Sequence, residues 1–115
     1  MAASGPLPSA SLHIVLALLE GEKHGYALMG DVERMSDGAI TMGPGTLYGT
    51  LKRLLTDGLI EETTARHESE SSDERRRYYR LTAEGAHVAS AELTRLQTLV
   101  RRLQRFHPDP GVEPA

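Results

Sequence analysis

The residues best suited to acid–base or metal chemistry are five histidines, and their spacing supports neither. They are scattered along 115 residues with no metal-ligand spacing and no accompanying acid–base constellation: His13, His24, His67, His87 and His107. The chain has no cysteine, which excludes disulfides, thiolate zinc sites and cysteine nucleophiles. We therefore predict no enzyme, no metal site and no cofactor, and interpret His24 as a structural residue.

The residues best suited to binding a polyanion lie on a short predicted helix. It begins at Pro44, where a missing amide proton costs nothing, and stops at Gly58. Its leucines at 47, 51, 54 and 55 form one apolar stripe that must face a core. The opposite side carries Lys52 and Arg53 among small and hydroxyl residues, and no carboxylate occurs before Asp57.

Such a side is typical of a helix that enters the major groove of DNA. Lys52 and Arg53 would meet phosphates or guanine edges, while Thr46 and Tyr48 would donate to phosphates. Gly45 and Gly49 would let the backbones approach closely, although a mid-helix glycine costs about 1 kcal/mol relative to alanine. The alternative is a solvated face that lacks acids by chance.

A second basic segment, RRRYYRL, reads as a strand ending at Leu81. Alternation places Tyr79 and Leu81 on the core side, which leaves Arg75, Arg76 and Tyr78 available to DNA. The alternative is that these arginines neutralise acids on the neighbouring strand, such as Glu61 and Glu62.

Charge is patterned locally rather than spread evenly. The net charge is −3, yet residues 75–80 hold four arginines and no acid. Residues 61–74 hold six acids against one arginine. An acidic block therefore adjoins a basic one. Because the net charge of the chain is negative, a protein partner is the alternative to DNA.

The positions of these residues require a particular order of elements. Apolar spacing predicts helices over 9–20 and 25–35, then the helix from Pro44, strands over 59–67 and 76–81, and a helix from the Thr82 cap to Phe106. Ile40–Thr41 is too short to assign beyond a single extended pairing. Three helices, a two-stranded hairpin and a last helix form a winged helix-turn-helix, a mainly α fold with a small β-hairpin.

The last helix carries a heptad seam. Its apolar residues step by three and four: Ala86, Ala89, Leu93, Leu96, Val100 and Leu103. So small a core cannot cover the whole stripe, so a second copy of the chain is the natural partner. The alternative is a stripe packed only within the monomer. A dimer would present two DNA-reading helices to half-sites about one helical turn apart.

These predictions divide the chain into four parts: a flexible N-terminus (1–8), a DNA-binding domain (9–81), a dimerisation helix (82–106) and a flexible tail (107–115). The longest apolar run, Ile14 to Leu19, is far too short to cross a membrane, and no signal peptide opens the sequence. We therefore expect a cytoplasmic protein with no membrane partner.

Several short motifs resemble the PadR family of bacterial transcriptional regulators. They are HGY at 24–26, PGTLY at 44–48, LKRL at 51–54, DGLI at 57–60 and RRYYRLTAEG at 76–85, and the likeness extends from about Leu12 to Leu103. The resemblance implies a winged-helix repressor that dimerises through its N- and C-terminal helices, in the short subclass with one C-terminal helix. Some such proteins release DNA when a small aromatic compound binds.

Residues and resemblance together define two candidate sites. The DNA-binding set is Tyr26, Pro44, Gly45, Thr46, Tyr48, Gly49, Lys52, Arg53, Arg75, Arg76, Arg77 and Tyr78, although Tyr26 is equally suited to packing. The dimer set is Leu12, Val15, Ala89, Leu93, Leu96, Val100 and Leu103.

The sequence departs from the family pattern at three places. Gly49 stands where the family usually has proline, Leu55 stands where it has an acid, and the predicted wing loop HESESSDE is unusually acidic. We therefore expect no phosphate contact from the wing tip. The predicted partners are a pseudo-palindromic DNA operator, a second copy of the chain and a small apolar or aromatic effector, for which Leu12, Val15, Leu96 and Leu99 could line a pocket. The alternative function is a winged-helix module that binds protein.

Overall fold

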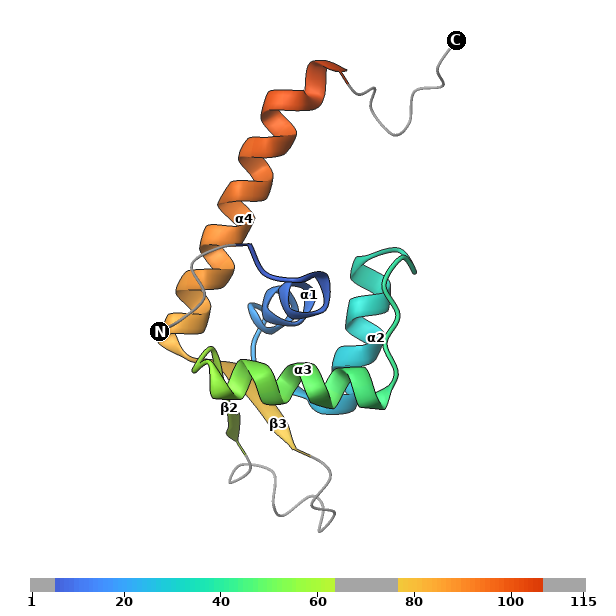
Figure 1. Cartoon of the computed structure of the whole chain (residues 1–115), viewed down its shortest axis with the longest axis vertical. Coiled ribbons are helices and arrows are strands. Elements are labelled where there is room, and N and C mark those ends of the chain that lie inside the picture. The colour runs from blue at the N-terminus through green and yellow to red at the C-terminus, as the bar shows by residue number, and fades with distance from the viewer. Residues whose placement is uncertain (1–5, 64–76, 107–115) are drawn as a thin grey trace.

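The computed structural model describes residues 6–63 and 77–106, which form helices around a small sheet (Figure 1). The elements in chain order are α1 (Ser9–Leu18), β1 (Lys23–His24), α2 (Gly25–Met35), α3 (Pro44–Thr56), β2 (Ile60–Thr63), β3 (Tyr78–Leu81), α4 (Ala83–Leu103) and the 3₁₀ turn η2 (Gln104–Phe106). No described helix has both the length and the apolar character that crossing a membrane requires.

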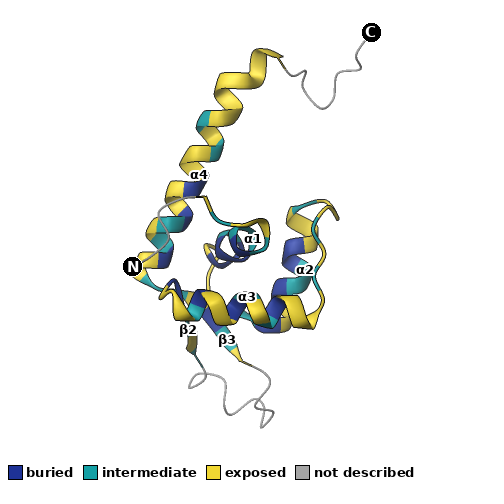
Figure 2. Cartoon of the chain, in the orientation of Figure 1, coloured by how far each residue is buried: buried dark blue, intermediate teal, exposed yellow. Residues whose placement is uncertain are grey.

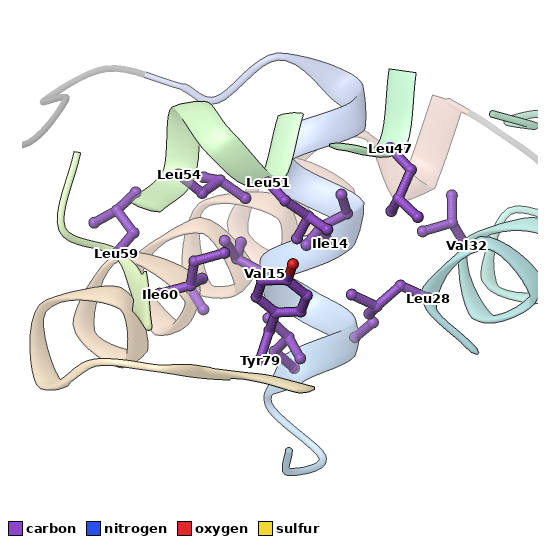
Figure 3. Close-up of a cluster of buried hydrophobic side chains, with 13 residues drawn as sticks. Ile14, Val15, Leu28, Val32, Leu47, Leu51, Leu54, Leu59, Ile60 and Tyr79 are labelled. Carbon is purple, nitrogen blue, oxygen red and sulfur yellow. The ribbon is translucent and has the colours of Figure 1, made fainter. Parts of the chain in front are cut away.

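Helix α1 forms the centre of the core. Ile14 and Val15 are fully buried, and α1 contacts α2, α3, β3 and α4. The leucines of α3 and Tyr79 of β3 close around it (Figure 3). Because α1 is surrounded on most sides, its sequence is apolar over most of its circumference rather than along one stripe. The helix ends at Leu18, two residues earlier than predicted.

Helix α3 has the predicted caps and core stripe. Gly43 is extended at the N-cap, and Gly58 adopts a left-handed φ of 77° that ends the helix. Leu47, Leu51 and Leu54 are buried, while Leu55 is only half-buried at the edge of the stripe. The turn at Gly58 then directs Leu59 into the core.

The prediction of a two-stranded hairpin was incomplete, because the sheet has three strands in the order β1-β3-β2. Lys23 and His24 pair antiparallel with Tyr79 and Tyr78 and extend the wing towards α2. Two residues are too few to form an alternation pattern, so this strand carries no signal in the sequence. Ile40–Thr41 is not assigned to a strand. Residues 64–67 and Arg76, which were predicted to lie in the strands, fall outside the described ranges.

Helix α4 packs at one end and projects at the other. Thr82 caps it, accepting a hydrogen bond from the Gly85 amide at 3.0 Å and donating to the Gly58 carbonyl at 2.7 Å. Ala89 is fully buried against the core. Beyond this point α4 extends away from the body and is largely exposed (Figure 2). The helix proper ends at Leu103, and η2 completes the span predicted as helix.

Candidate nucleic-acid interface

Helix α3 lies at the end of the molecule from which β2 and β3 project (Figure 1). Gly45, Thr46, Gly49, Lys52 and Arg53 are all exposed on it. A Cβ atom added at Gly45 or Gly49 would meet no atom within 4 Å, so neither glycine is required by packing within the chain. Open backbone on this surface is what close approach to a duplex would need.

The two cations of α3 are unpaired in the described part of the molecule. None of the ion pairs within residues 6–63 and 77–106 involves Lys52 or Arg53. No neighbouring carboxylate on these elements therefore neutralises their charge. Pro44 is exposed at the start of the same helix, where free amides and the helix dipole attract anions.

An aromatic cluster joins β1, α2, α3 and β3 beside this surface. The His24 Nδ1 atom accepts the Tyr26 amide proton at 3.0 Å and so caps α2. The His24 ring stacks on Tyr26 with centroids 5.7 Å apart and meets Tyr78 edge-on at 5.2 Å. Tyr26 in turn meets Tyr48 edge-on at 6.2 Å. Four of the aromatic residues singled out in the sequence thus form one continuous cluster.

Tyr48 is half-buried in this cluster rather than freely offered to a ligand. A Cβ atom on Gly25 would lie 3.0 Å from the Tyr48 hydroxyl oxygen, so a side chain at position 25 would require Tyr48 to shift. Burial raises the pKa of Tyr48, with a further contribution from Tyr26 and an opposing one from Arg77. Tyr26, by contrast, is 49% exposed at the edge of the surface.

Two ion pairs in the wing support the alternative prediction that its arginines neutralise acids on the neighbouring strand. Arg77 pairs with Glu62 at 3.1 Å and Arg80 with Glu61 at 2.7 Å. Both pairs are exposed, so each contributes little to stability but lowers the local positive charge. Arg75, Arg76 and the acidic wing loop lie outside the described residues.

Sequence reasoning missed an ion-pair group that joins β1 to α2. The buried carboxylate of Asp31 on α2 pairs with Lys23 of β1 at 2.8 Å and with Arg34 one turn along the helix. Lys23 also pairs with Glu20 at 2.7 Å. These two carboxylates raise the pKa of Lys23, Asp31 contributing the more. The only sequence signal was an acid on the otherwise apolar side of α2.

The predicted dimer residues fall into two groups. Val15 and Ala89 are fully buried in the core of the single chain. Leu93, Val100 and Leu103 of α4 are 40%, 60% and 49% exposed. An open groove on this part of α4 is lined by Leu93, Leu96, Gln97, Val100, Arg101 and Gln104. The described residues contain no cluster of His, Asp and Glu able to hold a metal ion.

Three helices flanked by a small sheet, with α3 exposed, define a winged-helix fold. The family model of the PadR-like transcriptional regulators matches residues 15–91. The chain therefore belongs to the PadR-like family, and the resemblance noted in the sequence is confirmed. No curated protein sequence matches the chain.

Solved structures with the same fold include several regulators. A transcriptional regulator from Clostridium thermocellum has a TM-score of 0.61 at 23% identity, over 85% of this chain and 92% of that chain. RosR from H. salinarum has a TM-score of 0.63 at 24% identity, over 93% and 84%. ZitR from Lactococcus lactis in complex with DNA has a TM-score of 0.64 at 21% identity, over 90% of this chain and 62% of ZitR. These likenesses confirm the winged-helix fold.

Proposed function

We propose that this regulator is a sequence-specific DNA-binding repressor that inserts α3 into the major groove. The observation that carries the proposal is the exposed side of α3, where open glycines stand beside the cations Lys52 and Arg53 and no carboxylate intervenes. Cations on such a surface can reach phosphates or guanine edges, and Gly49 removes the side chain that would hold the helix away. The DNA-bound structure of ZitR supports this use of the fold.

Further contacts would flank the α3 helix. Thr46, near the start of α3, and the exposed Tyr26 are placed to donate hydrogen bonds to phosphates. Tyr48 acts behind them as a support, because its ring lies under Tyr26 and its hydroxyl faces Gly25. In the wing, Arg75 and Arg76 remain the predicted backbone contacts, since Arg77 already has Glu62 as a partner.

The repressor would act as a homodimer through the projecting half of α4. The exposed apolar residues Leu93, Val100 and Leu103 are three members of the heptad seam, and Leu96 lies between them on the same face. Leu12 of α1 is half-buried and could extend this surface, while Val15 and Ala89 would support it from the core. Two copies would present two α3 helices to a pseudo-palindromic operator.

The most specific part of the proposal is that a small apolar or aromatic effector releases the repressor from DNA. The groove on α4, lined by residues such as Leu96 and Val100, offers apolar surface that a second copy would partly enclose. A compound bound there would change the spacing of the two α3 helices and thereby weaken operator binding. A compound panel that never reduces operator affinity would remove the effector from the proposal while leaving DNA binding in place.

A winged-helix module that binds protein is the second candidate. The Arg77–Glu62 and Arg80–Glu61 pairs favour it, because they remove positive charge from the wing of a chain whose net charge is −3. Selection of duplexes from a random-sequence pool, followed by fluorescence anisotropy, separates the two candidates. The repressor predicts enrichment of a pseudo-palindrome whose affinity falls steeply with salt. Recovery of no preferred duplex, with no binding even at low salt, would favour the protein-binding module.

A further inference from the structure

We propose that His24 is a positioning residue that fixes the wing strand β3 relative to the DNA-facing helix α3. The inference rests on the proposed function for its effect on DNA binding, and on the geometry alone for its effect on the aromatic cluster. His24 belongs to β1, the short strand between β3 and the start of α2.

The ring of His24 is the middle member of a path from the wing to α3. Tyr78 of β3 meets the His24 ring edge-on at 5.2 Å, and His24 stacks on Tyr26 at 5.7 Å. Tyr26 then meets Tyr48 of α3 edge-on at 6.2 Å. Each spacing lies within the range in which aromatic pairs attract beyond simple burial. Removal of the His24 ring would break the path of ring contacts between Tyr78 and Tyr26.

The backbone around His24 leaves its ring little freedom. His24 pairs with Tyr78 in the sheet, and the next amide, that of Gly25, donates to the Arg77 carbonyl at 3.0 Å. Gly25 is buried, and a Cβ atom added there would make a tight contact of 3.0 Å with the Tyr48 hydroxyl oxygen. A change in the angle of β3 would therefore shift the backbone of His24, and the stacked ring would carry that shift to Tyr26.

His24 has two separable tasks. Its Nδ1 atom accepts the Tyr26 amide proton and caps α2, which requires an acceptor but no ring. Its ring links Tyr78 to Tyr26, which requires a ring but no acceptor. His24→Asn retains a good N-cap and loses the ring, whereas His24→Phe retains a ring and loses the acceptor. The pair of variants therefore distinguishes capping from positioning.

The test compares both variants with the unmodified protein on the duplex that this protein selects from a random-sequence pool. We expect His24→Asn, measured well below its own Tm, to bind roughly tenfold more weakly, as after loss of one or two phosphate contacts. Its hydroxyl-radical footprint should lose protection at the outer flanks and keep the centre. We expect His24→Phe to lower Tm by about 4–8 °C, the effect of one lost cap, and to retain the flank protection.

If His24 only stabilises the fold, the two variants should rank in the opposite order of DNA affinity. If affinity follows Tm, so that His24→Phe binds more weakly than His24→Asn and the latter keeps its flank protection, positioning by the ring is contradicted. NMR decides the same point without DNA, because His24→Asn should weaken the cross-peaks between the Tyr26 and Tyr48 rings. Unchanged cross-peaks would overturn the inference. Failure of the unmodified protein to select any duplex would instead contradict the proposed function.

Discussion

Gly85 of α4 lies directly against the carbonyl group of Leu59. A Cβ atom added at Gly85 would stand 1.8 Å from the Leu59 oxygen and 2.8 Å from its carbon. The same oxygen accepts the Thr82 amide proton at 3.0 Å, so the first turn of α4 is held against the start of β2. The close approach leaves no room for a side chain at position 85.

Gly85→Ala is expected to destabilise the protein by about 3 kcal/mol, the upper range for overpacking, because the obstructing atoms belong to the backbone and cannot rotate away. Urea unfolding monitored by circular dichroism measures the loss. Gly30→Ala on α2 is the matched control, since its Cβ would meet only the Arg34 guanidinium at an ordinary 3.5 Å. Equal stabilities for the two variants would show that α4 does not need this contact.

Gly49→Ala should raise the stability of the protein but weaken its binding to DNA. The added Cβ meets nothing within 4 Å, so the helix should gain about 1 kcal/mol from the lower entropy of its unfolded chain. The same methyl group would stand on the side of α3 that we propose faces DNA, and there it should reduce operator affinity. Gly30→Ala again serves as control, because it makes the same change on a different helix. Unchanged affinity in the Gly49→Ala variant would show that α3 does not approach DNA at this position.

Substitution of the α4 seam should dissociate the proposed dimer. Leu96→Asp places a charge at the centre of the proposed interface, and Val100→Asp does so at a residue that is 60% exposed in the single chain. Sedimentation equilibrium should then report monomers, with secondary structure retained in the Val100→Asp variant. Thr94→Asp on the outward side of α4 is the control and should remain dimeric. A dimer that survives both seam substitutions would place the interface elsewhere.

Stability should fall in strongly alkaline solution. Burial raises the pKa of Tyr79 above the ordinary value of 10.0, with Glu62 and Tyr48 adding to the shift and Arg77 opposing it. A group whose pKa is raised by folding contributes fully below its unfolded pKa, and the contribution is lost as pH rises through the folded pKa. Urea unfolding as a function of pH should therefore show a decline above about pH 10.

Tyr79→Phe tests the origin of this decline. The variant removes one phenol whose ionisation the fold resists, so its stability should fall less between pH 10 and 11.5, roughly the range in which tyrosine ionises. Tyr48 and Lys23 also have raised pKa values and contribute losses of the same sign, so a remaining slope is expected. An unchanged pH profile in the Tyr79→Phe variant would contradict the assignment to Tyr79.

Elements with a strong repeating pattern could be predicted from the sequence. The leucine stripe and caps of α3, the Thr82 cap and the alternation that buries Tyr79 are all local signals, and the structure confirms them. The strand β1 could not be predicted, because its two residues acquire their conformation from pairing with β3. The Gly85 contact likewise depends on Leu59, which lies 26 positions away.

The candidate site was predictable in its outline only. The exposed side of α3 follows from its helical period, so Lys52 and Arg53 were placed correctly on the surface. The aromatic cluster joins residues from four elements, and no local pattern predicts that Tyr26 meets Tyr48 edge-on or that His24 caps α2. The partners of Arg77 and Arg80 depended on strand register, which the sequence alone did not establish.

The most direct measurement is the salt dependence of operator binding for a Lys52→Ala/Arg53→Ala double variant. Arg80→Ala is the matched control, because it removes an exposed cation that is already paired with Glu61. For a dimer, the double variant should bind more weakly and reduce the slope of log K against log salt by about 3 to 4, while its Tm stays unchanged. An unchanged slope and affinity, with binding otherwise intact, would contradict the claim that α3 carries the DNA contact.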